Sequence, residues 1–200
     1  TLLFLGSGVS AANIWNTDIY PIIPSDCATI TIANFNVNTG YGDPCWTNST
    51  INANPGDYIN VRVYYHNTGS TTATNTHILL NSPSGSSTSH SFSGQITSPE
   101  GNLFFGPATV NIPTAQTLTW GTTKWYPNQS QTAIDLSNST DIDIGSIAPG
   151  WNAQGSVVIG FAVGNNIPTN NCSISNFNAS PTSITTGGSS TLTWNTTNCS

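Results

Sequence analysis

The chain carries almost no charge, and this scarcity limits what it can be. Of its 200 residues only two are Lys or Arg and eight are Asp or Glu, so 5% are charged. The surface of an ordinary soluble domain is about a quarter to a third charged. Most catalytic and metal sites need clustered acids, bases or ligands. We therefore expect no enzyme, no cofactor and no metal centre.

The same scarcity excludes two classes of partner. The only cations are Arg62 and Lys124, too few to neutralise a nucleic-acid backbone or to form a polybasic membrane patch. No apolar run approaches the 18 or more residues of a membrane-spanning helix, so we expect no membrane span. With 36% hydrophobic and 10% aromatic residues, the chain has enough apolar side chains to form a core.

Short β-branched segments separated by Gly, Pro and Asn predict an antiparallel all-β sandwich. The clearest strand is Tyr58–Tyr65, in which Ile59, Val61, Val63 and Tyr65 share one face. The other strands are expected at 29–37, 77–81, 103–105, 117–120, 133–136, 156–163, 172–177 and 190–194. Residues 82–98, rich in Ser, Gly and Thr, are expected to form a long exposed loop or hairpin tip.

The cysteines indicate an oxidising compartment. They form two local pairs, one near each end of the chain, and no His stands at zinc-ligand spacing from either. We expect the disulfides Cys27–Cys45 and Cys172–Cys199, with four free thiols as the alternative. Disulfides persist outside the cytosol, which predicts an extracellular or cell-surface protein.

Glycosylation would supply the solubility that charges do not. The acceptor pattern Asn-x-Ser/Thr arises easily in a chain rich in these residues, so each occurrence alone is weak. The pattern occurs at Asn48, Asn128, Asn138, Asn171, Asn178, Asn195 and Asn198. Together with extracellular cysteines, these sites predict attached glycans.

An apolar N-terminal segment predicts self-association. We divide the chain into an N-terminal extension (1–16), a β-sandwich (17–168) and a partial second module or docked strands (169–200). An extended segment can complete a neighbour's open sheet edge, and such a head-to-tail contact builds a fibre. The residues expected to contact the neighbouring subunit are Leu2, Leu3, Phe4, Leu5, Val9 and Ala11. The alternatives are a first strand of the same domain and the remnant of a secretory signal.

Two stretches resemble known bacterial modules. The run from Pro55-Gly56-Asp57 to Asn67-Thr68-Gly69, with a later Pro149-Gly150 before a long strand, resembles Ig-like repeats of prokaryotic surface proteins. Residues 177–200 look like the opening strands of a second bacterial Ig-like module. The resemblance implies an Ig-like sandwich of seven strands, secretion, and roles in walls, surface layers, adhesins or filaments. It brings no catalytic residues.

The remaining polar and aromatic groups are weak signals. Asp135, Asp141 and Asp143 could bind calcium, although turn and cap roles fit them better. Among the tryptophans, we expect Trp120 and Trp194 to fill sandwich cores. The cluster of Trp120, Trp125 and Tyr126 leaves a sugar-binding face as the alternative.

The sequence thus favours a structural subunit of an extracellular filament or surface layer, a homopolymer joined head to tail by N-terminal strand donation. The alternative is a carbohydrate-binding module of the adhesin type. A structural subunit would form polymers without ligand, whereas an adhesin would be a monomer retained on glycans.

Overall fold

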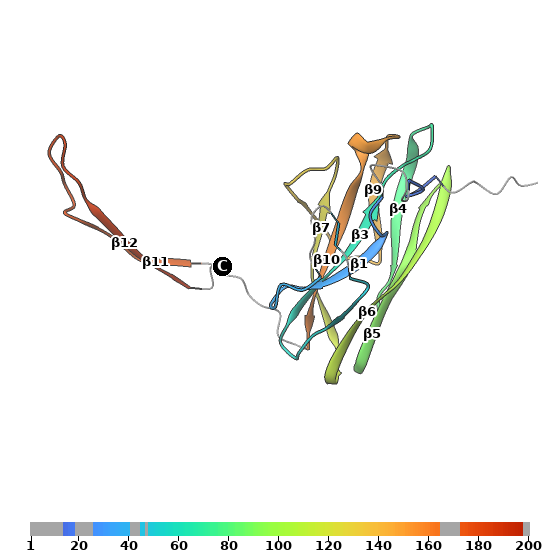
Figure 1. Ribbon diagram of the computed structural model, residues 1–200, viewed down its shortest axis with the longest axis horizontal. Coiled ribbons are helices and arrows are strands. Elements are labelled where there is room, and N and C mark those ends of the chain that lie inside the picture. Colours follow the sequence, from blue (N-terminus) through green and yellow to red (C-terminus); the bar gives the residue numbers. More distant parts are fainter. Residues whose placement is uncertain (1–13, 19–25, 41–44, 47, 165–172, 198–200) are drawn as a thin grey trace, which may run out of the picture. The chain divides into compact units, whose positions relative to one another are not determined.

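The structure is a computed structural model that describes residues 14–18, 26–40, 45–46, 48–164 and 173–197. The chain divides into two compact units, Thr1–Ile167 and Pro168–Ser200. The all-β prediction is confirmed: the first unit is a sandwich of two five-stranded sheets (Figure 1). Within the described ranges the only helical element is the 3-10 turn η1 (Trp151–Ala153), and no helix could cross a membrane.

The first sheet carries the candidate site and is antiparallel throughout. Its strands, in spatial order, are β1 (Ile30–Asn34), β3 (Tyr58–Tyr65), β10 (Gly155–Val163), β7 (Leu118–Tyr126) and β8 (Ile134–Leu136). At its centre, Val61 of β3 pairs with Ile32 on one side and Ile159 on the other. The sequence-predicted span and facing of Tyr58–Tyr65 are confirmed, since Ile59, Val61, Val63 and Tyr65 are all fully buried.

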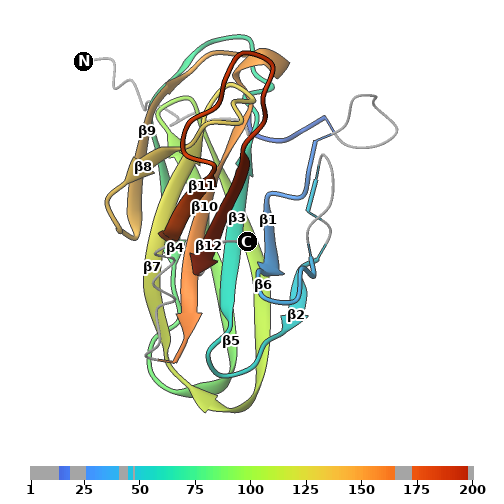
Figure 2. The same ribbon diagram turned by 90° about the vertical axis from the view of Figure 1, so that its left-hand side faces the viewer.

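The second sheet covers the inner face of the first (Figure 2). Its strands are β2 (Thr50–Asn52), β6 (Gly101–Gln116), β5 (Ser87–Ser98), β4 (Ala73–Asn81) and β9 (Asp141–Ile147). All pairs are antiparallel except the short β2–β6 contact. The long β5–β6 hairpin turns between Ser98 and Gly101, where the Ser98 hydroxyl bonds the Gly101 backbone.

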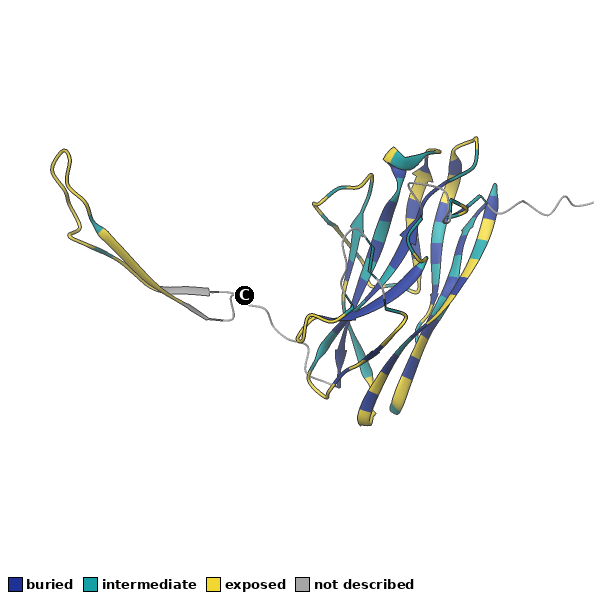
Figure 3. Ribbon diagram, viewed as in Figure 1, coloured by how far each residue is buried: buried dark blue, intermediate teal, exposed yellow. Residues whose placement is uncertain are grey.

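The core lies between the two inner faces. Phe161 of β10 meets Phe92 of β5 across the sandwich and Trp120 of β7 within its own sheet, with ring centroids 5.0 Å apart in both pairs. Buried and exposed residues alternate along most strands (Figure 3). Each fully buried large apolar side chain contributes about 1.5–3 kcal/mol, so these layers suffice to hold the fold.

The expectation of a loop at 82–98 is wrong over most of its length. Ser87–Ser98 is strand β5, and its inward positions include His90, Phe92 and Ile96. Inward and outward positions alternate along this segment as in any strand. The pattern is hard to recognise in the sequence, because Ser and Thr fill most outward positions and some inward positions hold small residues. Gly94 is required within it, because a Cβ there would lie 2.1 Å from the Leu79 carbonyl oxygen of β4.

Two tryptophan assignments also change. Trp120 packs against the core as expected, but Trp194 is 55% exposed. The tryptophan that is fully buried in the first unit is Trp15, whose indole N–H donates to the Gly101 carbonyl oxygen at 3.0 Å. The strand expected at 29–37 is shorter, because the chain turns after Asn34 and leaves Phe35 half-exposed.

The second unit is a two-stranded antiparallel hairpin, as the two expected strands there predicted. It consists of β11 (Ser173–Ser180) and β12 (Thr191–Thr197). The rings of Phe177 and Trp194 stack across the strands with centroids 6.4 Å apart, and both side chains are more than half exposed. The hairpin therefore has no buried core of its own within the described residues.

Candidate functional site

A cleft of about 950 Å³ lies on the outer face of the first sheet. We call it the sheet-face cleft. Its floor comes from the outward positions of two central strands: Asn60, Arg62 and Tyr64 on β3, and Ser156 and Val158 on β10. These residues face each other directly, since Tyr64 pairs with Ser156 and Arg62 with Val158. The floor is therefore fixed by the register of the sheet.

One wall of the cleft is held by a disulfide. Cys27, which precedes β1, is bonded to Cys45, which precedes β2, and their Cα atoms are 5.4 Å apart. This bond confirms the first predicted disulfide, and both cysteines line the cleft together with Phe35 and Asn38. The second predicted pair, Cys172 and Cys199, lies outside the described residues.

The opposite wall joins two segments distant in the sequence. Gln129, in the turn after β7, makes two hydrogen bonds to the η1 segment. Its backbone N–H donates to the Gln154 carbonyl oxygen at 2.9 Å, and its side-chain amide N–H donates to the Trp151 carbonyl oxygen at 2.8 Å. Both segments contribute lining side chains. These hydrogen bonds hold the wall in place over the sheet.

The lining combines aromatic rings with amides. The aromatic residues are Phe35, Trp46, Tyr64, Tyr126 and Trp151, and the amides are Asn38, Asn60, Gln129, Gln131 and Gln154. Rings offer flat apolar faces, and amides both donate and accept hydrogen bonds. Such a surface suits a neutral, hydroxyl-rich ligand, and Arg62 adds a single cation.

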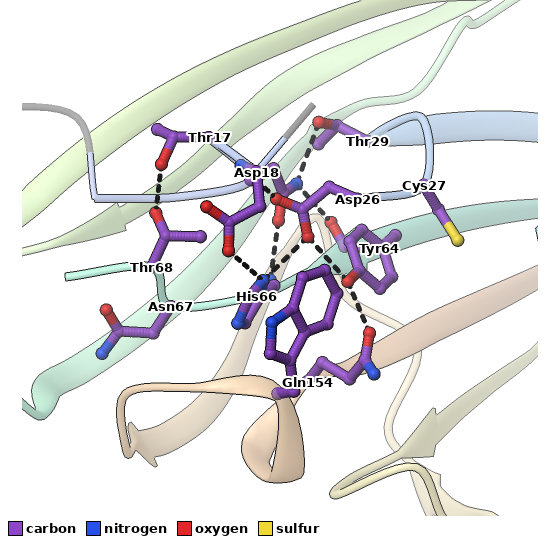
Figure 4. Close-up of polar contacts among 12 residues, drawn as sticks. Thr17, Asp18, Asp26, Cys27, Thr29, Tyr64, His66, Asn67, Thr68 and Gln154 are labelled. Atoms are coloured by element: carbon purple, nitrogen blue, oxygen red, sulfur yellow. Dashed lines mark hydrogen bonds and ion pairs between the residues drawn. The ribbon is translucent and has the colours of Figure 1, made fainter. Parts of the chain in front are cut away.

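A hydrogen-bond network shares two residues, Tyr64 and Gln154, with the lining of the cleft (Figure 4). We call Asp26, His66, Tyr64 and Gln154 the Asp26 network. Asp26 Oδ1 accepts from the Tyr64 hydroxyl at 2.9 Å and contacts His66 Nδ1 at 2.8 Å, while its Oδ2 accepts the Asp18 backbone N–H at 2.8 Å. The Tyr64 hydroxyl also lies 2.5 Å from the side-chain amide of Gln154. The Trp151 ring packs on His66 with centroids 4.1 Å apart.

Burial changes the ionisation of two floor residues. Burial is the main cause that raises the pKa of Tyr64, and the hydrogen bond to Asp26 adds to it because that bond needs the phenolic proton. Burial lowers the pKa of Arg62, yet a guanidinium stays protonated at neutral pH. Tyr64 therefore stays a neutral phenol within the Asp26 network, and Arg62 brings one positive charge to the floor.

Asp18, Asp26 and His66 bring three possible metal ligands within 4.8 Å of one another. Both oxygens of Asp26 and the Nδ1 atom of His66 are already engaged in the Asp26 network. His66 Nε2 is buried and has no hydrogen-bond partner, so within the described residues no hydroxyl completes a catalytic triad. The arrangement fits a support for the cleft better than a metal or nucleophile site.

The other predicted site residues lie apart from the cleft or outside the described residues. Asp135 pairs with Lys124 and Asp141 with His77, while Asp143 caps the Gly145 N–H, so these three acids do not form one group. Among the sugar-acceptor asparagines, those in exposed positions are Asn128, Asn138, Asn178 and Asn195. Asn48 is half-buried, and Asn171 and Asn198 are outside the described residues, as are all six predicted subunit contacts.

Of the aromatic cluster Trp120, Trp125 and Tyr126, only Tyr126 lines the cleft. Trp125 packs against the core instead, and its indole N–H donates to the Tyr65 hydroxyl at 2.7 Å. Sequence reasoning missed Arg62, Tyr64, Asp26, His66 and Gln154 as site residues. One signal was available in the sequence: the only Arg of the chain lies on the outward face of its most clearly predicted strand.

These features define a disulfide-bonded all-β sandwich module with a cleft on one sheet face. Comparison with protein-family models, with curated proteins and with solved structures finds no match.

Proposed function

We propose that the first unit is a non-catalytic, carbohydrate-binding module of an extracellular surface protein. The observation that carries the proposal is the sheet-face cleft, with its five rings and five amides. Sugar rings present apolar C–H faces that stack on aromatic side chains, and hydroxyl groups that exchange hydrogen bonds with amides. The Cys27–Cys45 disulfide supports an extracellular location.

The state of the sheet edges favours binding over strand donation as the role of this unit. A donated strand needs an unpaired, unbroken edge. On β6, β2 covers only Thr109–Asn111, and the adjoining edge is interrupted by a bulge and by Pro107, which has no N–H to donate. The far edge, β9, carries Asp141 and Asp143 on its exposed face. Such features discourage strand addition.

The edges of the first sheet are also poor acceptors. β8 is three residues long. On β1, the backbone N–H groups of Ile32 and Asn34 already donate to the Asn48 and Thr39 carbonyl oxygens. Strand donation by the N-terminal extension (1–16) remains a separate prediction.

The test is direct titration of the full chain with neutral oligosaccharides of glucose, mannose and N-acetylglucosamine and with oligouronates. We expect at least one class to bind and Tyr126→Ala to weaken that binding about tenfold, the loss of about one stacking contact. Phe104→Ala is the matched control, because Phe104 is 79% exposed on the other sheet. Binding by no saccharide, or equal losses in the two variants, would contradict the proposal.

A further inference from the structure

Arg62 is a cation without a carboxylate partner among the described residues. The chain has two basic residues, and the other, Lys124, lies 2.6 Å from an Asp135 carboxylate oxygen. Among the described residues, the ion pairs involve only His66, His77 and Lys124. Arg62 is therefore the one described cation whose charge no carboxylate balances, and it lies in the floor of the cleft.

The contacts of Arg62 fix its position without satisfying its hydrogen-bonding capacity. Nη2 is 3.9 Å from the Cys27 sulfur, and the guanidinium carbon is 5.4 Å from the centroid of the Tyr64 ring. Nη1 is buried and has no hydrogen-bond partner. A buried donor that bears charge and lacks a partner is costly, so the site gains from any group that supplies an acceptor.

A second unpartnered donor lies beside it. Thr31 of β1 stands directly opposite Arg62 in the β1–β3 register, so both side chains leave the same face of the sheet. Side chains at such positions have Cβ atoms about 5 Å apart. Thr31 is 1% exposed, and its hydroxyl also has no hydrogen-bond partner. Thr31 does not line the cleft, however, so of these two neighbours only Arg62 can meet a ligand there.

We propose that Arg62 is the anion-binding group of the sheet-face cleft and that the saccharide bound there carries a carboxylate. The inference rests on the proposed function. A carboxylate matches the planar guanidinium, which can donate two parallel hydrogen bonds to it. The Tyr64 ring and the Cys27 sulfur hold the guanidinium in place for this contact.

The net charge of the chain makes the subsite selective. At −6 overall, the protein repels polyanions at long range, so an acidic ligand gains only where it reaches Arg62. At 0.15 M salt the screening length is about 8 Å, which weakens the distant repulsion and leaves the direct contact. Specificity for a carboxylate therefore depends on Arg62 rather than on a basic surface.

The experiment compares three oligosaccharides of equal length by calorimetric titration in 0.15 M NaCl: an oligouronate, its neutral counterpart and a sulfated counterpart. We expect the wild-type chain to bind the oligouronate at least tenfold more tightly than either. Arg62→Gln should abolish this preference, so that the variant binds the oligouronate no more tightly than its neutral counterpart. Lys124→Gln is the control for a lost charge, since Lys124 does not line the cleft, and it should change neither affinity.

Thr31→Val is a further control of nearly the same shape, and it should leave the oligouronate affinity unchanged, since Thr31 does not line the cleft. Circular dichroism establishes that each variant is folded. Equal affinities for acidic and neutral sugars in the wild type, a preference that survives Arg62→Gln, or tighter binding of the sulfated sugar would overturn the subsite. In all three cases the proposed function stands, whereas binding of no saccharide would remove both.

Discussion

Trp15 shows how one residue can tie a terminal segment to a core. Its ring is fully buried, its indole N–H bonds Gly101 at the start of β6, and its backbone bridges to Asn67. The next residue, Asn16, donates its N–H to the His66 carbonyl oxygen at 3.0 Å. Trp15 therefore anchors the chain just ahead of the residues that join the Asp26 network.

Removal of this anchor should be costly. We expect Trp15→Ala to lower the free energy of unfolding by about 3–5 kcal/mol, the usual loss for a buried aromatic side chain. Urea unfolding followed by far-ultraviolet circular dichroism measures it. Trp194→Ala is the control, because Trp194 is half-exposed in the other unit. A loss below about 1 kcal/mol for Trp15→Ala would show that the ring is not part of the core.

The two buried tyrosines predict that the free energy of unfolding falls at high pH. Burial raises the pKa of Tyr65 to about 12, and it raises that of Tyr64 as well. Since the unfolded phenol ionises near pH 10, the unfolded state loses its protons first. Stability is therefore full below about pH 10 and is lost as the pH rises toward 12. We expect urea unfolding from pH 9 to 11.5 to show this fall, by roughly 2 kcal/mol.

The Tyr64→Phe variant sharpens the test, because it removes one ionising group and keeps the ring. Its stability should fall less steeply above pH 10 than that of the wild type. Absorbance at 295 nm reports tyrosinate directly, and the part of its rise that comes from Tyr64 and Tyr65 should accompany unfolding. Ionisation of all tyrosines near pH 10 without loss of structure would contradict the prediction.

At the scale of elements, one wall of the cleft depends on the segment between Cys27 and Cys45, which the hydrogen bonds of the sheets alone do not hold in place. The Cys27–Cys45 bond joins residues 18 apart, and the segment between them contains β1 and one wall of the cleft. A disulfide that closes a loop of about this length stabilises a protein by roughly 3 kcal/mol. The bond thus contributes both to stability and to the shape of the cleft.

Replacement of both cysteines by serine should lower the free energy of unfolding by roughly 3 kcal/mol and weaken saccharide binding. Thermal unfolding and titration measure the two effects separately. The same titration with dithiothreitol added to the wild-type chain should reproduce the loss of binding. If reduction left the affinity unchanged, the disulfide wall would have no part in the site.

At the scale of the whole molecule, strand donation by the N-terminal extension (1–16) makes a prediction that is independent of the cleft. Deletion of residues 1–12, which include all six predicted subunit contacts, leaves Trp15 and its core contacts in place. If the segment joins neighbouring copies, the full chain forms fibres in negative stain and the truncated chain stays monomeric with unchanged circular dichroism. Fibres that persist in the truncated chain, or a full chain that never forms them, would refute donation.

The fold could be predicted from the sequence further than the site could. Strand β3 was predictable because its apolar residues alternate over its whole length, and the Cys27–Cys45 bond because its cysteines are near each other. The Asp26 network was not, since Tyr64 and Gln154 are 90 positions apart and His66 and Asp26 are 40 apart. Such pairs meet only through strand order, which no local pattern specifies.

The division of the cleft into strand floor and loop walls has a consequence for how the module can diversify. Asn60, Arg62 and Tyr64 lie on a strand bonded on both sides, so they can hardly move without remodelling the sheet. Gln131 and its neighbours lie in a surface turn, where insertions and replacements are tolerated. Related modules can therefore change their ligand specificity by substitutions and insertions in that turn, while the sheet that forms the floor stays the same.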